Sequence, residues 1–569
     1  MFLKKVKGFK GRIFLQIVNG YRDESGKVKH EVVESIGYLD ELLDTYEDPI
    51  KHFTQRAKAL TDKQDLETTV TFNPKKELND SASSLRNVGY LALKPVLNNL
   101  NLKPIFKTLE VKYQTQTSLE EIFNFLVYSQ IIHPSSKQSS FNKKHMFLEN
   151  YSFSEDQMYR ALSYFGNSFE SIKDSLYKLT DAAYKLDTQT TYYDGTNFYF
   201  EIDREDDFRK KGPSKELRPN PLVSIGLLVD SNGIPIDISI YPGNESEKPH
   251  FNQTIKDMKT KHKITGKTIY VADKGLNTAS NIYSAITSGD GYIYSQTVKG
   301  ASELTKTTIE HELGFEEVLD YEGNVDFLIK GFKEDVVLKV PQEDGPDIKF
   351  KTEQTKVITW SKKYAEKTKY ERDKLISKAK NIARNPSMYK KDQLGVAAKY
   401  LKKIMYDKNG EIIKDTSELV INQSLIDKEA RMDGYYLIVT SETHMKAIDI
   451  FRQYHNLYGI EETFKVTKMF LKVRPVYLQL EARIKAHVLV AYVSLILLRI
   501  IESKILKGKY SFHQIIEGLR IYQCAMIKPN LYFFFNYNDV VLELANISGS
   551  NIKLETRTLI EIRNLFDKY

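Results

Sequence analysis

Hydrophobic residues recur every three to four positions along the stretch from Ala92 to Tyr184. That spacing places apolar side chains on one face of an α-helix, so we predict a helical region there. Ser118 and Ser154 each stand three residues before a Glu or Gln, which is the capping-box pattern of a helix start. The apolar residues that follow Ser118 on one helical face are Leu119, Ile122, Phe123, Leu126 and Val127.

The pattern changes at Thr190, where short runs of β-branched and aromatic residues alternate with turn residues. Three predicted strands come first, and Asn232-Gly233 between the second and the third is a hairpin turn signal. Helices and strands then alternate, which predicts an α/β sheet of the ribonuclease H type. The predicted strands are 191–202, 222–229, 234–241, 268–272 and 292–298, and the predicted helices are 248–261 and 277–287.

A long interval from Gly300 to about Met432 separates two parts of this predicted sheet domain. We interpret the interval as an insertion that interrupts the sheet. Within it the β-like pieces are 325–332, 336–340 and 357–360, and after it come a strand at 435–440, a helix at 442–471 and an apolar helix at 486–506.

Near the start of the chain, two predicted strands at 12–20 and 27–37 flank the turn signal Asp23–Gly26. A predicted helix at 49–61 and a polar linker at 62–84 follow. We therefore predict a small N-terminal β-hairpin region ahead of the helical region.

Together these patterns predict an α/β protein with a ribonuclease H-like mixed-sheet core. A β-rich, basic insertion domain interrupts this core, and a helical DNA-binding region precedes it. The predicted regions are 1–84 (N-terminal hairpin, helix and linker), 85–189 (helical, a candidate DNA-end-binding region with scaffolding as the alternative), 190–299 (core, first part), 300–433 (insertion), 434–506 (core, second part) and 507–569 (C-terminal, a candidate dimerisation region).

Positive charge is concentrated in the predicted insertion. The chain has a net charge of +8, whereas residues 361–403 alone carry 14 Lys and Arg against 4 Asp and Glu, a net of +10. Such a segment suits a polyanion, either nucleic acid or a membrane surface. The alternative is an ordinary solvated helix face. The candidate contact residues are Lys374, Lys378, Lys380 and Arg384.

The composition of the chain indicates the kind of cellular compartment that it suits. Hydrophobic residues make up 41% of the 569 residues, enough for folded cores. A single cysteine, Cys524, excludes an intrachain disulfide framework and a Cys-based metal cluster, and it fits a reducing, cytoplasmic location. No long apolar run follows the basic start, so we expect no signal peptide. The apolar stretch Val488–Leu498 is too short to span a bilayer, so we expect a buried helix and no membrane partner.

Three acidic residues stand where sheets and helices place ligands. Asp194 lies within the first predicted strand, Asp273 at the end of a later strand, and Glu461 on the predicted helix 442–471. Carboxylates on adjacent elements hold hard divalent cations. Two such ions about 3.5–4 Å apart stabilise the attacking and leaving oxygens at a phosphodiester. Taken singly, each acid also has a structural explanation as a turn former, a helix cap or a surface partner of Lys465.

The run from Tyr454 to Lys468 resembles the Y-x2-R-x3-E-x6-K signature of bacterial insertion-sequence DDE transposases, with Glu461 at the Glu position. The resemblance extends in the same order from near the start of the chain to about residue 505. Further segments that resemble the family are Tyr193-Asp-Gly-Thr196, Tyr241-Pro-Gly-Asn-Glu-Ser-Glu247, Val271-Ala-Asp-Lys-Gly-Leu276, Arg474-Pro-Val-Tyr477 and Arg483-Ile-Lys-Ala-His487.

The resemblance implies a transposase that cuts the ends of its element and transfers them by a two-metal mechanism, in cut-and-paste fashion through a hairpin intermediate. It implies Asp194, Asp273 and Glu461 as ligands of two Mg²⁺ or Mn²⁺ ions. It further implies DNA as the partner, both terminal inverted repeats and target, a homodimer that brings two ends together, and a nucleoid-associated location. The DNA contacts expected besides the basic segment are Tyr454, Lys465, Lys468, Arg474 and Trp360.

Three positions leave alternatives open. Leu457 stands where the signature has Arg, and leucine cannot donate to a phosphate. We expect the helix to be irregular there, with Leu457 in the core and Lys465 or another cation at the phosphate; the alternative is that Leu457 faces DNA. Glu462 competes with Glu461 for the third acid, and spacing selects Glu461. Trp360 stacks on a flipped base by analogy with similar transposases, or it simply packs within a strand.

Two other functions remain open at this stage. One is a domesticated or decayed transposase that binds DNA without catalysis, and the other is a structure-selective nuclease without strand transfer. The sequence contains no H-E-x-x-H motif and no Gly-rich phosphate loop. His487 lies in an apolar helix, where we expect a satisfied core residue.

Overall fold

In the computed structural model the chain forms two units, Met1–Asp80 and Ser81–Tyr569, which are described separately. The structure describes the chain apart from residues 9–10, 23–27, 64–84, 215–218, 263, 265, 312–313, 343–344, 385–394, 403–419, 474–475 and 568–569. The predicted hairpin turn 23–26 and most of the predicted linker 62–84 therefore lie outside the described residues.

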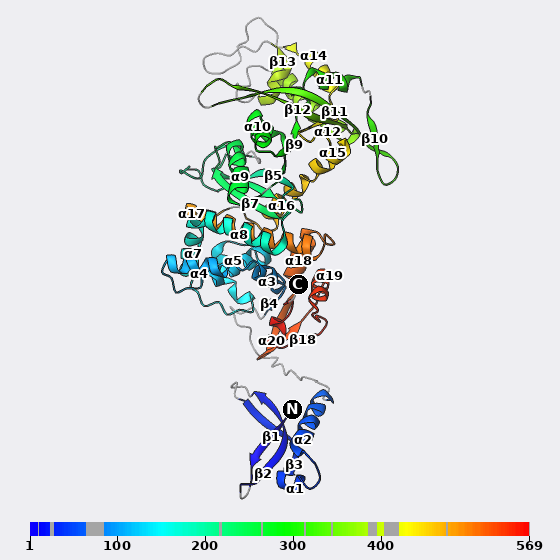
Figure 1. The fold of residues 1–569 in the computed structure, drawn as a ribbon. Coiled ribbons are helices and arrows are strands. Elements are labelled where there is room, and N and C mark those ends of the chain that lie inside the picture. Colours follow the sequence, from blue (N-terminus) through cyan, green and yellow to red (C-terminus); the bar gives the residue numbers. More distant parts are fainter. Residues whose placement is uncertain are drawn as a thin grey trace. The chain divides into compact units, whose positions relative to one another are not determined.

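The first unit is a three-stranded antiparallel sheet in the order β1-β2-β3 (Figure 1). Its core is formed by Leu15 and Ile17 of the central strand with Phe53 and Ala57 of helix α2. The first strand was not predicted, because three of its six residues are lysines and mask the apolar alternation. The elements are β1 (Phe2–Lys7), β2 (Ile13–Arg22), β3 (Val28–Tyr38), α1 (Leu39–Leu42) and α2 (Pro49–Lys63).

The second unit is built on a nine-stranded mixed sheet in the order β10-β11-β12-β15-β9-β8-β5-β6-β7. Strands β5, β6 and β7 pair antiparallel, and β8 and β9 join the other edge of β5 in parallel. The predicted strands of this part are confirmed to within three residues at each end. They are β5 (Thr190–Tyr199), β6 (Leu222–Val229), β7 (Pro235–Pro242), β8 (Ile269–Ala272) and β9 (Gly291–Gln296).

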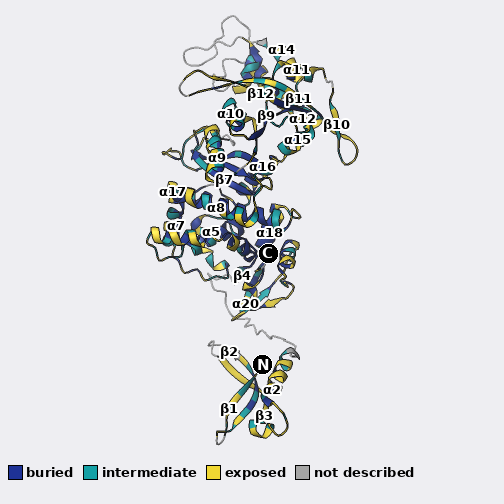
Figure 2. Ribbon diagram, viewed as in Figure 1, coloured by how far each residue is buried: buried dark blue, intermediate teal, exposed yellow. Residues whose placement is uncertain are grey.

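The strands of the predicted insertion belong to this same sheet. Strand β12 pairs with β15, and β15 pairs with β9, so the long strands of the insertion extend the core sheet. The insertion also contains a separate two-stranded sheet of β13 (Leu401–Lys402) and β14 (Val420–Ile421). The predicted pieces 325–332 and 336–340 are one strand, because the charged residues between them keep the alternation of exposed and buried positions. Much of β11 is exposed, as Figure 2 shows. The elements are β10 (Glu316–Leu319), β11 (Val325–Val340), β12 (Ile348–Trp360) and β15 (Tyr435–Thr440).

Helices cover both faces of the sheet (Figure 1). Helices α9 and α10 share a core with the inward side chains Tyr193 and Tyr270, whereas α16 and α17 pack with Tyr192 and Phe198 on the other side. A third, small core joins α12 to α14. The bounds are α9 (Glu247–Lys261), α10 (Ala279–Thr287), α11 (Glu303–Glu310), α12 (Lys362–Arg384), α14 (Gln423–Ala430), α15 (Ala447–His455), α16 (Tyr458–Met469) and α17 (Glu481–Ile500).

Helix α17 is apolar on all sides because it lies between the helical region and the sheet. It contacts α5, α7 and α8 as well as β7. The segment Glu481–Ile505 is the one described helix long and apolar enough to cross a membrane, and 94% of its most apolar window is buried inside the protein. The helical region comprises α3 (Lys94–Asn99), α4 (Lys103–Lys112), α5 (Leu119–Ile132), α6 (Lys137–Asn142), α7 (Glu155–Asn167) and α8 (Phe169–Tyr184).

The C-terminal region is joined to the start of the helical region through a four-stranded sheet in the order β18-β17-β16-β4. Strand β4 comes directly before the helices, and Asn87 within it donates to the carbonyls of Leu519 and Arg520. Residues 507–569 are therefore structurally continuous with the helical region. The bounds are β4 (Leu85–Asn87), β16 (Gln523–Lys528), β17 (Leu531–Phe534), β18 (Thr556–Arg557), α18 (Phe512–Ile521), α19 (Asp539–Ser548) and α20 (Leu559–Arg563).

The contact between α7 and α17 allows a sharp stability test. A Cβ on Gly166 would lie 1.7 Å from the Ala482 carbonyl oxygen, whereas a Cβ on Gly459, also helical, meets nothing within 4 Å. We expect Gly166→Ala to lower the free energy of unfolding by about 1–3 kcal/mol through overpacking. Gly459→Ala should leave it unchanged or raise it by up to about 1 kcal/mol. Chemical denaturation measures both, and equal effects of the two variants would contradict the close approach.

Candidate functional site

Two of the three predicted acids are neighbours across parallel strands. Strands β5 and β8 pair with Tyr193 opposite Ala272, so the next positions along them are Asp194 and Asp273. Adjacent strands lie about 4.8 Å apart. Tyr193 and Ala272 point into the core with α9 and α10. Because side chains alternate along a strand, Asp194 points to the opposite face, where α16 packs.

Asp273 lies where β8 ends and the chain turns. Its carboxylate accepts a hydrogen bond from the Ser295 hydroxyl at 2.8 Å and one from the Lys274 backbone N–H at 2.7 Å. Ser295 belongs to β9, the next strand of the sheet. The carboxylate of Asp194 accepts from the backbone N–H of Gly195 at 2.8 Å. Neighbouring strands and the local backbone therefore orient both acids.

Glu461 reaches the same place from α16. A pocket of about 370 Å³ is lined by Asp194 and Glu461 together, with two of the predicted cations beside them. Glu462, the competing candidate, lies instead near Arg499: burial lowers the pKa of Arg499, and the charges of Glu502 and Glu462 act in the opposite direction. The structure thus favours Glu461 as the acid that faces Asp194. The lining residues are Asp194, Gly195, Thr196, Glu461, Phe464, Lys465, Lys468 and Met469.

A pair of tyrosine hydroxyls lies near the acids. The hydroxyls of Tyr436 on β15 and Tyr454 on α15 are 2.8 Å apart. Burial raises the pKa of Tyr436, and the negative charges of Asp273 and Glu461 raise it further. Both carboxylates are therefore within electrostatic range of a single hydroxyl. Tyr436 was not predicted as a site residue, because an aromatic residue in an apolar strand cannot be told from core packing.

These acids have the oxygen donors that a hard divalent cation prefers. Among the described residues, however, no group of three His, Cys, Asp or Glu side chains is close enough to hold one ion. The structure brings the acids together as two pairs instead. Asp194 is next to Asp273 in the sheet, and it shares its pocket with Glu461.

The signature segment is not one helix as predicted. Helix α15 ends at His455 and α16 begins at Tyr458, with Leu457 at the boundary. Leu457 is only 6% exposed and belongs to the main hydrophobic core. The expected local irregularity is thereby confirmed, and Leu457 faces the interior. Tyr454 belongs to α15 and Glu461 to α16, so the two signature residues stand on separate helices.

A fourth carboxylate, which the sequence analysis did not single out, lies on the opposite face of β5 from Asp194. Glu247 is the first residue of α9, and a Cβ on Gly195 would lie 2.1 Å from its Oε1 atom. The Glu247 carboxylate occupies the space that a side chain at position 195 would take, so a larger residue there would displace that carboxylate. A glycine directly after an acid inside a β-rich run was the available signal.

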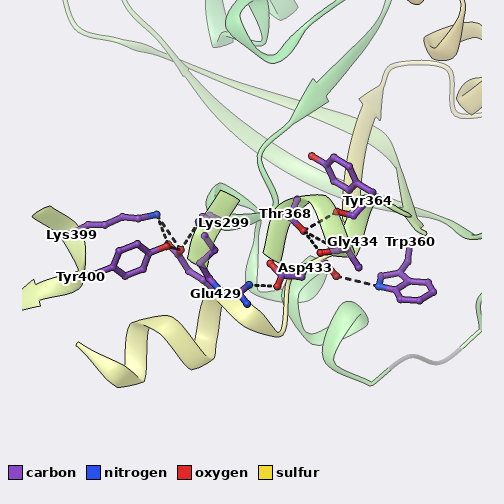
Figure 3. Close-up of polar contacts among 11 residues, drawn as sticks. Lys299, Trp360, Tyr364, Thr368, Lys399, Tyr400, Glu429, Asp433 and Gly434 are labelled. Atoms are coloured by element: carbon purple, nitrogen blue, oxygen red, sulfur yellow. Dashed lines mark hydrogen bonds and ion pairs between the residues drawn. The ribbon is translucent and has the colours of Figure 1, made fainter. Parts of the chain in front are cut away.

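Trp360 has the contacts of a packing residue. In β12 it lies opposite Leu328 and Tyr435, and its indole N–H donates to the carbonyl of Asp433 at 3.1 Å (Figure 3). Gly434 leaves it room, since a Cβ there would lie 2.6 Å from the indole nitrogen. The strand-packing alternative accounts for these contacts.

A second pocket, of about 340 Å³, lies next to Lys274 and Ser295, the neighbours of Asp273. Most of the residues that line it belong to the insertion. Lys299 and Lys399 both contact Glu429 there, at 2.7 and 2.9 Å, and Tyr400 donates to the same carboxylate (Figure 3). Burial alone would raise the pKa of Glu429, but the hydrogen bonds from Lys299, Tyr400 and Lys399 lower it to about 2. One carboxylate thus balances part of the positive charge of the insertion.

The basic segment forms α12, whose two faces differ. Ile376, Ala379 and Ile382 are buried in the small core of the insertion. Lys374, Lys378, Lys380 and Arg384 are all exposed. Of the remaining predicted contact residues, Lys465 is exposed and Lys468 is half-buried, whereas Arg474 lies outside the described residues.

The position of Leu457 yields a stability prediction. Leu457→Arg would place an unpaired charge in the core, which costs several kcal/mol, so we expect a large drop in melting temperature. Tyr458→Arg serves as the matched control, because Tyr458 is 62% exposed and should tolerate the change within about 0.5 kcal/mol. Thermal unfolding of both variants measures the difference. A Leu457→Arg protein as stable as the wild type would mean that this side chain faces solvent.

Comparison with known proteins adds the following. No curated protein matches the chain. The solved structures include a similar one, a Mos1 transposase paired-end complex with left transposon end, at 10% identity over 44% of this chain and 70% of that chain. Its TM-score of 0.14 does not establish a common fold. Residues 3–69 match the family model described as the N-terminal domain of IS1634 family transposases, and this match supports a transposase of an insertion sequence.

Proposed function

We propose that the protein is a DNA transposase that cuts the ends of its insertion sequence and joins them to a target by a metal-dependent DDE mechanism. One observation carries the proposal. The pairing of β5 with β8 places Asp194 beside Asp273, and α16 presents Glu461 to the pocket that Asp194 lines. The match of residues 3–69 to a transposase N-terminal domain supports it independently.

The sheet topology also supports a ribonuclease H-like core. Strands β7, β6, β5, β8 and β9 adjoin in that order, with the first three antiparallel and the last two parallel to β5. This is the arrangement expected from three hairpin-connected strands followed by alternating helices and strands. In such a sheet the acids on β5 and after β8 lie side by side.

Asp194, Asp273 and Glu461 would hold two Mg²⁺ or Mn²⁺ ions, with Asp194 shared because it is the acid paired with each of the others. When bound, such ions activate the attacking oxygen and stabilise the leaving oxygen of a phosphodiester. Lys465 and Lys468 line the same pocket and would hold the non-bridging phosphate oxygens. Ser295 would keep the Asp273 carboxylate oriented through its hydrogen bond.

The proposed reaction implies which partners the protein would bind. The terminal inverted repeats and the target would be the DNA bound, and two copies of the chain would hold two ends together in the cytoplasm, near the nucleoid. The exposed cations of α12 suit phosphate contacts, which position DNA without reading its sequence. Incubating the protein with the inverted-repeat DNA that flanks its gene, with Mg²⁺, and mapping the cut tests the function. Cleavage without joining would indicate a nuclease, and binding without cleavage a non-catalytic relative.

The acids yield the first prediction of this function. Asp194→Asn, Asp273→Asn and Glu461→Gln should each abolish cleavage, a loss of more than about 100-fold, because each removes a charged metal ligand. DNA binding, measured by fluorescence anisotropy, should survive. Glu462→Gln is the matched control and should cut normally. Loss of cleavage with Glu462→Gln and not with Glu461→Gln would show that the wrong glutamate is assigned.

The basic helix α12 yields the second prediction of this function. Replacing Lys374, Lys378, Lys380 and Arg384 together by Gln should weaken DNA binding and reduce the slope of log affinity against log salt by up to about four, since each phosphate contact contributes about one. Changing the four exposed residues should leave the melting temperature near that of the wild type. An unchanged salt slope would indicate that the exposed face of α12 is only solvated and does not contact DNA.

A further inference from the structure

A pocket of about 300 Å³ lies apart from the acids, where the helical region meets the connection between α16 and α17. Its walls come from the turn after α5, from Tyr159 on α7, from His487 on α17, and from Lys472, Val476, Tyr477 and Leu478 between α16 and α17. The described residues that line it include no Asp or Glu. They do include Lys137, which is only 5% exposed.

Lys137 is a buried cation without a carboxylate. Its ammonium donates one hydrogen bond, at 2.9 Å, to the side-chain carbonyl of Gln130, and Gln130 in turn donates to the Leu471 carbonyl. An ammonium has three N–H donors, and among the described residues only this one partner is found. Burial lowers the pKa of Lys137 to about 7, because no negative charge offsets the loss of solvation.

The other titratable groups that face Lys137 do not supply that charge. His487 donates from Nε2 to the Val473 carbonyl at 2.9 Å, which leaves Nδ1 as an acceptor without a partner among the described residues. Burial and the Lys137 charge lower the pKa of His487 to about 3, so the ring is neutral. Burial raises the pKa of Tyr159. Lys472 and Tyr477 are exposed at the mouth of the pocket.

A pocket that bound a neutral polar ligand would not need a buried lysine. Lysines are almost never fully buried without a partner, since the ammonium loses its hydration. A glutamine or methionine in place of Lys137 would fill the same space beside Gln130 at lower cost. The charge is best explained by an anion that enters the pocket from solvent and pairs with it.

We propose that this pocket binds a phosphate group, with Lys137 as its buried charge partner and Lys472 and the hydroxyls of Tyr159 and Tyr477 at the mouth. On the proposed function, the phosphate belongs to the DNA backbone; a free phosphate is the other source of the same chemistry. Lys472 comes three residues after the end of α16, and Met469 at that end lines the pocket of Asp194 and Glu461. A phosphate held here would therefore fix the connection that positions the acid-bearing helix.

The first test uses the full-length wild-type protein and inorganic sulfate, a phosphate mimic whose charge does not change between pH 6.5 and 8.5. Sulfate is compared with chloride at equal ionic strength. Because the pKa of Lys137 is lowered to about 7 by burial, its protonated fraction falls across this range in the unliganded protein. Sulfate should therefore raise the melting temperature clearly at pH 6.5 and much less at pH 8.5.

The second test compares Lys137→Gln with Lys143→Gln, which removes the same charge from an exposed neighbour outside the pocket. Lys137→Gln should lose the sulfate response, and it should weaken binding of an inverted-repeat duplex about tenfold with a salt slope lower by about one. Lys143→Gln should keep the sulfate response and change DNA affinity less than twofold.

The outcomes separate the possibilities. Loss of both responses in Lys137→Gln assigns the site to backbone phosphate, and loss of the sulfate response alone assigns it to a free phosphate. A wild-type sulfate effect that is equal at both pH values, or that persists in Lys137→Gln, would overturn the site, as would weakened DNA binding without any sulfate response. If Lys137→Gln does not fold, the wild-type pH comparison and Lys472→Gln at the mouth decide. The sulfate experiment contains no DNA, so its failure is distinct from a failure of Asp194→Asn to abolish cleavage.

Discussion

The candidate site depends on the parallel pairing of β5 with β8 in one particular register. Tyr193 opposite Ala272 buries both residues in the core with α9 and α10 and leaves Asp194 and Asp273 side by side on the next positions. A shift of one residue along either strand would turn its acid toward the apolar core. The hydrophobic burial that stabilises the sheet therefore also enforces the position of two carboxylates.

The third acid is brought to the sheet by a break in a helix. Leu457 enters the core at the point where α15 ends and α16 begins. Tyr454 then approaches from α15 and meets Tyr436, while Glu461 approaches from α16 and shares a pocket with Asp194. An arginine at position 457 could not occupy this buried place, because its charge would have no partner there. The cations that line the pocket are Lys465 and Lys468 of α16.

The insertion extends the sheet, and this changes how its charge is placed. Because β12 pairs with β15, the insertion is held to the core by a continuous ladder of backbone hydrogen bonds. Helix α12 follows β12 directly and is anchored through its apolar face, so its exposed cations belong to a fixed surface. Glu429 of the insertion binds Lys399 of the insertion and Lys299 of the core, which balances charge locally and leaves the excess on the outer face of α12.

Local patterns in the sequence determined most of the elements of the sheet. Strands 222–229 and 435–440 match β6 and β15, and Ser154 caps α7 with its capping box, because alternation and capping are properties of neighbouring residues. The resemblance to a transposase signature pointed to Asp194, Asp273 and Glu461, and tertiary structure brought them into two neighbouring pairs. The residues around position 457 predicted an irregular helix with Leu457 in the core, and the structure confirms this. Only tertiary contacts decided that the insertion joins the core sheet and that Lys137 is buried with no Asp or Glu partner among the described residues. Those features depend on which distant segments pack together, and the spacing of residues along the chain does not determine this packing.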